Sequence, residues 1–440
     1  MDAVVIGAGV VGVTAALALQ QRGLRVLLLE QHSVAQGCSF GNAGVIAPGA
    51  FPLGAYYRVL DFPAAFLKKR SPAALHWPST PGLLRWGIQY AKATRRDIVS
   101  RHTRLLHELC REALYSYELL LGADLPTVNR CGYSAVHLAP DECECATRIN
   151  LIRRSLGLAV QMLSGPDLIE MEPAIGHFAV GATFFEGSTH VIDPATFVAS
   201  LATVFIQRGG LLRCDRILGL QTKENGVVTV RGAHDNYSPK AVIIATGAHA
   251  NRLLADCNHR VPLASERGYH LDLDVSPGFL RRPTALPGRG LILTPTRQGA
   301  RIAGISHFGL PGFQARPELL LSALDSLHKR MPMLRPRPGS QVWSGERPST
   351  PDSLPIVEQV PGHRSIFVSC GHGHLGLTLG AVTARVVADL VMGHSSSYLK
   401  YLSSLRFKLK SRASSENLNT RTLCHGKTMR IRINEPSKTA

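Results

Sequence analysis

Glycines and one acidic residue near the start of the chain have the types and spacing needed to bind a dinucleotide. Gly7-Ala8-Gly9-Val10-Val11-Gly12 directly follows an apolar segment, residues 3–6, that is typical of a buried strand. In such a motif the first glycine permits the tight turn, the second lets the backbone approach a pyrophosphate, and the third lets the next helix pack on the strand. The first helical turn then offers N–H groups and its positive dipole end to the phosphates. Glu30, followed by Gln31, closes a second apolar segment and can accept a hydrogen bond from a ribose hydroxyl.

A second glycine-rich turn offers another helix N-terminus. Gly371-His372-Gly373-His374-Leu375-Gly376 follows an apolar segment, residues 365–370, and precedes a helix predicted over 377–392. No strand and acidic residue follow at the spacing of a second nucleotide unit, so we expect this helix to face an electron-rich group instead. The N1–C2=O2 edge of a flavin becomes negative on reduction, and a helix dipole stabilises charge there. A buried strand over 241–244, ending in Ala245-Thr246-Gly247-Ala248, is expected to return the chain to the nucleotide.

These segments carry a resemblance to a known family. The chain resembles the D-amino-acid oxidase family of FAD oxidoreductases, and within it most resembles the small subunits of D-amino-acid dehydrogenases and the D-hydroxyproline dehydrogenases. The resemblance rests on four segments: the first glycine motif, Ser39-Phe40-Gly41-Asn42-Ala43-Gly44 with Pro48-Gly49, residues 343–352, and residues 371–378. The first segment alone is moderately specific, but all four in this order and spacing make a strong signature.

The resemblance implies an α/β fold in which a Rossmann-type FAD-binding domain is interleaved with an antiparallel-sheet substrate domain. The FAD-binding domain would take residues 1–52, 190–262 and 355–395, the substrate domain 53–189 and 263–354, and a basic, disordered tail 396–440. Helical periodicity over 103–121 and strand-like alternation at 291–294 and 301–304 agree with this plan.

FAD is the expected cofactor, bound without a covalent link. Some secondary-amine oxidases of this superfamily attach FAD through a cysteine near the segment that corresponds to 343–352, where this chain has Gly345. Ile217 lies where the family lays a backbone group against the adenine. The expected FAD contacts are Gly7, Ala8, Gly9, Val10, Val11, Gly12, Glu30, Gln31, Ser39, Asn42, Ala43, Gly44, Ile217, Ala245, Thr246, Gly247, Gly371, Gly373, His374, Leu375, Gly376, Leu377 and Thr378.

Oxidation of an amino acid at its α carbon requires a fixed carboxylate, a Cα–H directed at the flavin, and a neutral amine. Arg347 lies in the segment where similar proteins hold a carboxylate-binding arginine, and a planar guanidinium can grip a carboxylate at two points. Tyr269 and His270 could supply a phenol hydrogen bond or a specificity-setting imidazole, with purely structural roles equally open. His374 is expected to touch the flavin or the substrate amine, whereas His372 is expected to be buried and hydrogen-bonded. Hydride transfer to a flavin needs no dedicated base once the amine is neutral, so we expect neither a catalytic triad nor a metal site.

Composition and charge limit the partners. The net charge is +18, and residues 396–440 hold ten Lys and Arg against two Glu. Such a balance can mark nucleic acid or an anionic membrane surface, or only a basic background with an unusual tail. The nine scattered cysteines are expected to be free thiols in a reducing compartment. No apolar run approaches the ~20 residues of a membrane span, and cleaving a signal peptide would remove the first strand, so a cytoplasmic protein is expected.

Two regions do not follow from the FAD motifs. Aromatic residues alternate with Lys and Arg over residues 50–95, which indicates either a membrane-surface or quinone-facing patch or ordinary core packing. The residues after Arg406-Phe407 are polar, basic and unpatterned, consistent with disorder or a frame-shifted end.

The sequence therefore predicts an FAD-dependent D-amino-acid dehydrogenase, cytoplasmic with a peripheral contact on the inner membrane face. It would oxidise a D-amino or D-imino acid, such as D-alanine or D-hydroxyproline, and pass electrons to a quinone or another respiratory acceptor, alone or with other dehydrogenase subunits. One alternative is a glycine- or sarcosine-type oxidase that uses oxygen. Another is a tRNA-modifying flavoprotein, although the charge is concentrated in the tail and no nucleic-acid partner is expected. A third is a non-catalytic component of a larger dehydrogenase, against which the presence of Arg347 argues.

Overall fold

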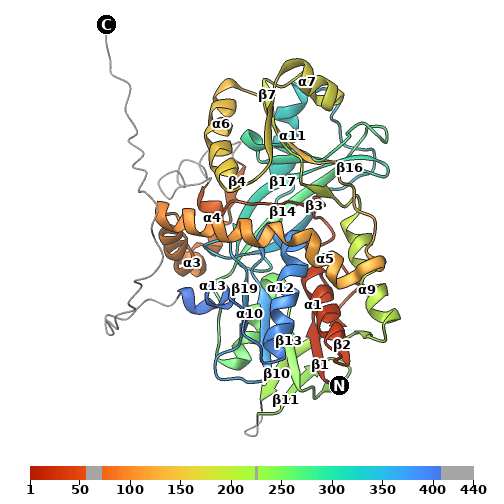
Figure 1. Cartoon of the computed structure of the whole chain (residues 1–440), viewed down its shortest axis with the longest axis vertical. Helices are drawn as coiled ribbons and strands as arrows, with labels where there is room; N and C mark the ends of the chain where they lie inside the picture. The colour runs from red at the N-terminus through yellow and green to blue at the C-terminus, as the bar shows by residue number, and fades with distance from the viewer. Residues whose placement is uncertain (56–71, 223–225, 408–440) are drawn as a thin grey trace. The chain divides into compact units, whose positions relative to one another are not determined.

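Two large sheets organise the residues described by the computed structural model, which are 1–55, 72–222 and 226–407 (Figure 1). One is a mostly parallel sheet of six strands and the other a mixed sheet of nine strands. Two smaller sheets accompany them, one formed by β10 (Ile217–Thr222), β11 (Val228–Gly232) and β12 (Asn236–Tyr237) and one by β3 (Val45–Ile46) and β8 (Thr189–His190). The architecture is the α/β fold predicted from the sequence.

The six-stranded sheet builds the nucleotide-binding half. Its strands are, in sheet order, β19 (Ile356–Gln359), β20 (Ile366–Cys370), β13 (Ala241–Ile244), β1 (Ala3–Ile6), β2 (Val26–Glu30) and β9 (Leu211–Cys214). β1 pairs in parallel with both β2 and β13, and only β19 runs antiparallel to its neighbour. The four residues of β1 are all buried, as expected for a parallel strand covered on both faces. These strands come from the three segments that we proposed for the FAD-binding domain.

The nine-stranded sheet draws its strands from the two segments proposed for the substrate domain. In sheet order they are β18 (Trp343–Ser349), β14 (Ala264–Leu273), β17 (Gly299–Gly309), β16 (Leu291–Thr296), β15 (Thr284–Leu286), β5 (Tyr133–His137), β7 (Gly181–Phe185) and β6 (Val160–Leu163), with β4 (Ala73–Leu75) paired to β17. β14 runs antiparallel to both β17 and β18. The predicted strands at 291–294 and 301–304 lie in β16 and β17, which also pair antiparallel.

The helices surround these two sheets (Figure 1). They are α1 (Val10–Gln21), α3 (Thr80–Ala93), α4 (Arg96–Arg111), α5 (Ala113–Leu121), α6 (Pro140–Ser155), α7 (Gly165–Met171), α8 (Pro173–Gly176), α9 (Pro194–Gln207), α10 (Ala250–Leu254), α11 (Glu318–His328), α12 (Gly376–Val391) and α13 (Leu399–Leu402). The single helix predicted over 103–121 is instead divided between α4 and α5 at Glu112. Its predicted end is correct, because Gly122 follows with φ +57.

The chain beyond α12 differs from our prediction at its start. Residues 396–407 were assigned to a disordered tail, yet they include α13 and a short 3₁₀ turn. Arg406 forms an ion pair with Asp352 at 2.7 Å, and the Ser403 hydroxyl donates to the Glu358 carboxylate at 2.8 Å. These contacts fix the segment to Asp352, near the end of the second substrate-domain segment, and to Glu358 of β19 in the FAD-binding half. The rest of the predicted tail, 408–440, lies outside the described residues.

The aromatic and basic segment divides between core and surface where the structure describes it; residues 56–71 lie outside that part. On α3, Trp86 and Tyr90 are buried and their rings stack 5.3 Å apart. On the same helix Leu84 is 66% exposed, and nearby in sequence Trp77 is 61% exposed. One side of α3 therefore packs as core, while large apolar side chains remain on its other side.

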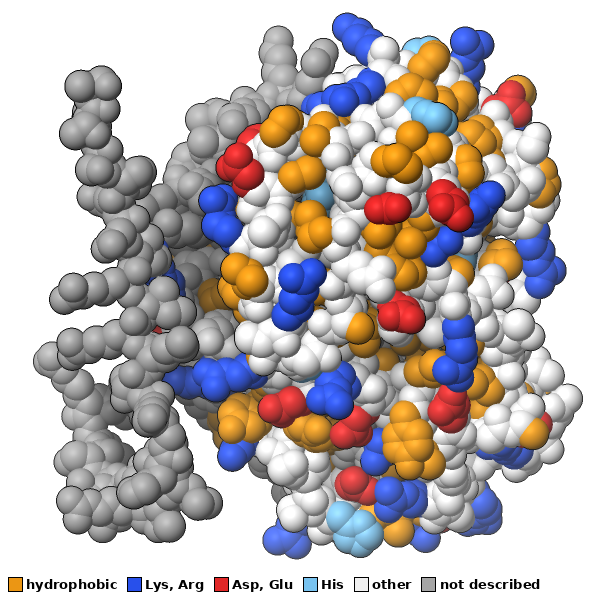
Figure 2. All heavy atoms as spheres, turned by 45° about the horizontal axis from the view of Figure 1, so that its top comes forward, with side chains coloured by type: hydrophobic (Ala, Val, Ile, Leu, Met, Phe, Trp, Pro, Cys, Tyr) orange, Lys and Arg blue, Asp and Glu red, His pale blue; other side chains and the backbone are white. Residues whose placement is uncertain are grey.

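The surface charge is mixed where Figure 2 shows it. Lys and Arg side chains are spread over this face among hydrophobic and acidic side chains. The described residues on this face therefore form no single positive patch.

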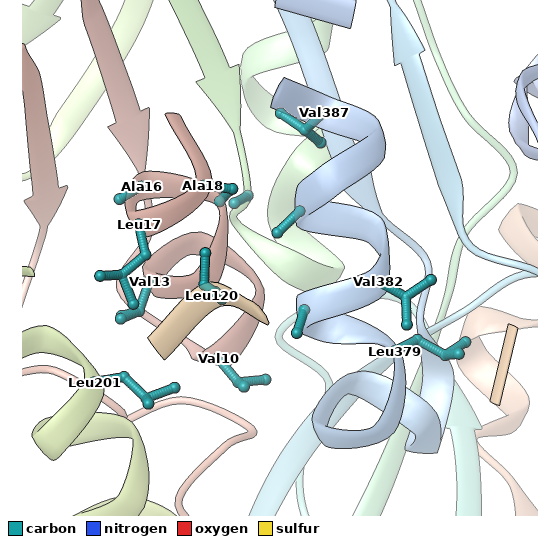
Figure 3. Packing of buried hydrophobic residues seen from close by; sticks show 14 of the residues in the cluster. Val10, Val13, Ala16, Leu17, Ala18, Leu120, Leu201, Leu379, Val382 and Val387 are labelled. Atoms are coloured by element: carbon teal, nitrogen blue, oxygen red, sulfur yellow. The ribbon is translucent and has the colours of Figure 1, made fainter. Parts of the chain in front are cut away.

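Helices α1 and α12 pack side by side in the core of the nucleotide-binding half (Figure 3). Val13 and Leu17 of α1 and Val382 of α12 are buried in one hydrophobic cluster, which joins the two helices. In the described part of the chain, one helix (Gly373–Val391) is long and apolar enough to cross a membrane, but 67% of its most apolar stretch is buried inside the protein. We therefore describe it as a core helix. A Cβ placed on Gly376 would lie 3.7 Å from Val10, so the two helix N-termini meet.

Candidate active site

A cleft of about 500 Å³ lies at the carboxyl ends of β1, β2, β13 and β20 and extends to β18. Crevices at this edge of a parallel sheet are the usual ligand sites of doubly wound folds. Most residues that we expected to contact FAD line this cleft. They are Gly7, Gly9, Val10, Val11, Glu30, Gln31, Ser39, Asn42, Ile217, Ala245, Thr246, Gly247, Gly373, Gly376 and Leu377.

The first glycine motif has the local geometry of a phosphate cradle. A Cβ on Gly12 would lie 1.8 Å from the Gly7 oxygen, so only glycine permits this close packing of α1 on the turn. A Cβ on Gly9 would meet only Ser39 Oγ, at 3.3 Å, because Gly9 faces the cleft. Ser39 Oγ accepts the Val10 N–H at 3.0 Å, which shows that an oxygen fits against the start of α1.

The other polar groups of the cleft also fit a flavin dinucleotide. Glu30 Oε2 accepts the Ala8 N–H at 2.8 Å, so the carboxylate is held at the end of β2 next to the glycine turn. Thr246 Oγ1 and Ser369 Oγ are buried without a hydrogen-bond partner in the described structure, and both residues line the cleft. A dinucleotide with a polar flavin edge would provide partners for such hydroxyls.

The remaining expected FAD contacts are not among the residues that line the cleft. They are Ala8, Gly12, Ala43, Gly44, Gly371, His374, Leu375 and Thr378. Thr378 Oγ1 donates to the Val45 oxygen at 3.4 Å and so connects α12 to β3. Gly44 has φ +73, and a Cβ there would lie 2.1 Å from the Val191 oxygen. The structure gives these two residues a supporting role in the wall of the cleft.

Arg347 lies on β18 directly opposite Glu266 of β14. Arg347 Nη1 lies 3.3 Å from Glu266 Oε1, and the same Nη1 donates to the Ile305 oxygen at 3.4 Å. The guanidinium crosses Gly268, where a Cβ would lie 2.1 Å from Nη2. Both hydrogen bonds that Arg347 makes within the described residues thus leave from Nη1.

Aromatic rings lie beside Arg347 on the same face of the sheet. His270 pairs with Trp343 across β14 and β18, and their rings stack 4.7 Å apart. The Phe40 ring lies 6.2 Å from the His270 ring. Burial, reinforced by the charge of Arg301, lowers the pKa of His270 to about 4. The imidazole is therefore neutral at pH 7, and this wall is uncharged.

Tyr269 does not join this group, and of the two roles that the sequence left open for it, its contacts favour the structural one. Successive side chains of a strand point to opposite faces, so Tyr269 faces away from His270 and Arg347. It is 1% exposed, and its hydroxyl contacts His307 Nδ1 at 2.8 Å and accepts the Arg316 N–H at 3.0 Å. The phenol is engaged in the substrate-domain core, which argues against contact with a substrate.

The two histidines of the second glycine-rich turn have different environments. His372 is buried, its Nε2 lies 2.9 Å from Thr383 Oγ1, and burial lowers its pKa to about 3, as a buried structural histidine requires. His374 has solvent access. The surrounding protein lowers the pKa of His374; the Glu266 carboxylate opposes this effect and the Arg347 charge adds to it. His374 is thus placed near the Arg347 group.

Several residues of the site were not predicted from the sequence. Cys38, His249 and Arg252 line the cleft, and Trp343 forms part of its wall beside β18. Arg252 follows the expected strand end at 245–248 by only a few residues, so its basic side chain could have been noticed there. Burial raises the pKa of Cys38 to about 11, so its thiol is protonated at neutral pH. Glu266 had no signal in the sequence, because its pairing with Arg347 depends on strand register.

The fold, the glycine cradle and the cleft are those of a dinucleotide-binding protein. A family model described as FAD dependent oxidoreductase (DAO) matches residues 2–390. The chain therefore belongs to this family, and its cofactor is FAD. The residues of the cleft fit that group, as the cradle at Gly9 and the unpartnered Thr246 hydroxyl indicate.

Individual proteins extend the comparison. The chain is 29% identical over 405 residues to a D-amino-acid oxidase of Bradyrhizobium diazoefficiens, covering 88% of this chain and 94% of that protein. It is 26% identical over 411 residues to a D-amino acid dehydrogenase of Dechloromonas aromatica, covering 89% and 97%. Among solved structures, glycine oxidase from Geobacillus kaustophilus superposes with a TM-score of 0.69 at 21% identity, covering 92% of this chain and 98% of that one. This last likeness establishes the fold.

Proposed function

We propose that this protein oxidises a D-amino or D-imino acid to the corresponding imino acid, using FAD as the primary electron acceptor. The observation that carries the proposal is Arg347, whose chain neighbours Glu346 and Pro348 line the cleft and whose guanidinium lies on the sheet face that carries His270. Arg347 would bind the substrate carboxylate, and the neutral wall of His270 and Trp343 would contact the side chain. FAD, when bound, supplies the two-electron oxidant for the Cα–N bond of the substrate.

The reaction also requires a neutral substrate amine, so a bound ammonium group must lose a proton. His374 is a titratable side chain that has solvent access and lies near Arg347 and Glu266. Because the pKa of His374 is lowered, its imidazole is neutral at pH 7 and can accept a proton from a bound ammonium group. We propose that role for His374, and no separate base for the Cα–H.

Our proposals for the configuration of the substrate and for the electron acceptor are based on the names of similar proteins. The Bradyrhizobium protein is named an oxidase and the Dechloromonas protein a dehydrogenase, and both names specify D-amino acids. We propose a quinone or similar respiratory acceptor, with oxygen as the alternative. The exposed Leu84 of α3 and Trp77 in the turn just before it support a peripheral membrane contact that would bring the protein to such an acceptor.

The test screens the purified FAD-loaded protein against D-alanine, D-hydroxyproline, sarcosine and their L-counterparts where these exist, with an artificial dye acceptor. We expect dye reduction with a D-amino or D-imino acid and loss of that turnover in Arg347→Ala at unchanged flavin content. Peroxide formation in aerated buffer without dye would identify oxygen as the acceptor. Preference for L-amino acids, or full turnover in Arg347→Ala, would overturn the proposal.

A further inference from the structure

Arg347 is held by a group of residues that neither the glycine motifs nor the family comparison identifies. Glu266 is 1% exposed and lies opposite Arg347 in the register of β14 and β18. Each of its carboxylate oxygens has a partner. Ser306 Oγ donates to Oε1 at 2.6 Å, Arg347 Nη1 lies 3.3 Å from the same oxygen, and Ser349 Oγ donates to Oε2. The carboxylate is therefore fixed before any ligand arrives.

The charge of Glu266 is maintained although the side chain is buried. Burial raises the pKa of the Glu266 carboxyl, but the Arg347 charge, His374 and the two serine hydroxyls outweigh burial and hold the pKa below its usual value. A buried carboxylate beside a partly buried guanidinium is costly unless both are satisfied. The charged Glu266–Arg347 pair is therefore stable only while these hydrogen bonds keep their geometry.

The backbone around Arg347 is also shaped for it. Ile305 has φ +59, a left-handed conformation that is unusual for a β-branched residue. It lies where the register of β14 and β17 shifts between Arg267 and Tyr269, and this irregularity presents the Ile305 oxygen to Arg347 Nη1 at 3.4 Å. Strained backbone of this kind tends to gather at functional sites.

We propose that Glu266, Gly268 and Ile305 position Arg347 for its substrate. Glu266 and Ile305 occupy Nη1, and Gly268 leaves the space in which Nη2 lies. The guanidinium is thereby oriented with its other edge available to a carboxylate. Glu266 is a positioning residue, and its negative charge also weakens the attraction of Arg347 for simple anions. This inference rests on the proposed role of Arg347.

The experiment uses acetate as a probe, because acetate has a carboxylate but no ammonium group. Binding to the FAD-loaded protein is followed by the change in flavin absorbance, and turnover is measured with the amino acid found in the screen above. In Glu266→Gln the amide keeps the size of the side chain and removes its charge. We expect acetate to bind about 10-fold more tightly, because the repulsion between two carboxylates is removed. We expect kcat to fall roughly 10- to 100-fold, because Arg347 is less well oriented.

Gly268→Ala should act in the opposite direction on acetate. Gly268 is not among the residues with positive φ, so alanine suits the backbone, but its methyl group would displace Nη2. We expect acetate binding to weaken roughly 10- to 100-fold. In the Arg347→Ala background, Gly268→Ala should change neither acetate binding nor turnover further, because its effect acts through Arg347.

Two further variants keep the test decisive. Ser306→Ala removes one hydrogen bond to Glu266 without a change of charge, so kcat should fall at nearly unchanged acetate affinity. This variant tests the positioning role even if Glu266→Gln folds poorly. Glu358→Gln is the matched control. Glu358 is also a buried carboxylate that accepts from serine groups, but its partners are Ser403, Ser404 and His259 and not Arg347, so acetate affinity should be unchanged.

The outcomes separate this inference from the proposed function. Suppose that the wild-type protein turns over its substrate and binds acetate, and that Glu266→Gln and Gly268→Ala have the same kcat and the same acetate affinity. That result would overturn the positioning role alone. Equal effects of Gly268→Ala with and without Arg347 would also overturn it. A wild-type protein that neither turns over amino acids nor binds acetate would overturn the proposed function, and the inference with it.

Discussion

Gly9 offers a sharp test of the FAD cradle, because the structure predicts that a methyl group there harms the ligand and not the fold. Gly9 precedes α1 with φ −74 and ψ 176, a conformation that alanine adopts without strain. The added Cβ would meet only Ser39 Oγ, at 3.3 Å. Replacing glycine by alanine at a compatible site stabilises a protein by about 0.4–1 kcal/mol through the unfolded chain. We therefore expect the apoprotein of Gly9→Ala to unfold at the wild-type temperature or slightly above it.

FAD binding should respond very differently. A methyl group on Gly9 would occupy the space through which the pyrophosphate approaches the N–H groups at the start of α1. Loss of one hydrogen bond to a charged phosphate costs about 1.5–3 kcal/mol, which is a roughly 10- to 100-fold rise in Kd. The measurements are thermal unfolding of the apoprotein and titration of the apoprotein with FAD, followed by flavin fluorescence.

Gly12→Ala is the matched control. Its Cβ would lie 1.8 Å from the Gly7 oxygen, so α1 must move away from β1. Overpacking of this kind costs about 1–3 kcal/mol or more, and this variant should lose both stability and FAD. Wild-type FAD affinity in Gly9→Ala, or a loss of apoprotein stability equal to that of Gly12→Ala, would refute the assignment of Gly9 to the phosphates.

Changes elsewhere in the chain test the remaining assignments. Glu30→Ala should weaken FAD binding by about 1.5–3 kcal/mol, the scale of a charge-assisted hydrogen bond, and unchanged affinity would show that the ribose contact is misassigned. FAD should be released intact by acid or heat, because Gly345 offers no thiol; yellow colour that stays with the precipitated protein would contradict this. Arg347→Lys should lose at least ~100-fold in kcat/KM, nearly as much as Arg347→Ala, because an ammonium group cannot reproduce a two-point grip; near-normal turnover of either variant would remove Arg347 from the site. A chain ending after Lys410 should keep FAD and turnover, whereas one ending after Gly393 should be destabilised through loss of the Arg406–Asp352 pair; precipitation of the longer form would show that residues beyond 410 pack on the body.

The Glu266–Arg347 pair adds a prediction about pH. In the wild type the folded-state pKa of Glu266 lies below its unfolded value, so its contribution to stability is present above the unfolded pKa and is lost as the pH falls through the folded one. In Arg347→Ala burial remains without the guanidinium, so the folded pKa should lie above the unfolded value. The variant should then lose stability as the pH rises, by about 3–5 kcal/mol at neutral pH. Adding Glu266→Gln should remove this pH dependence, and denaturant unfolding at pH 5 and pH 8 measures it.

Much of the nucleotide site was predictable because its geometry is local. Gly7, Gly9 and Gly12 act through backbone conformation and close packing within one strand–turn–helix unit, so the residue types nearly determine the shape. The expected strands at 3–6 and 241–244 correspond to β1 and β13 as the structure has them. Apolar runs bounded by glycine were sufficient to locate them.

Tertiary structure decided the substrate side of the site. Tyr269 and His270 were both candidates from the sequence, and only the strand β14 and its register with β18 show that His270 alone shares the face of Arg347. The Glu266–Arg347 pair and the carbonyl of Ile305 come from strands distant in sequence. A one-residue change of register would separate all three groups. The sequence by itself therefore determined the family, the cofactor and the cradle, while the orientation of the carboxylate-binding arginine depends on how three strands align.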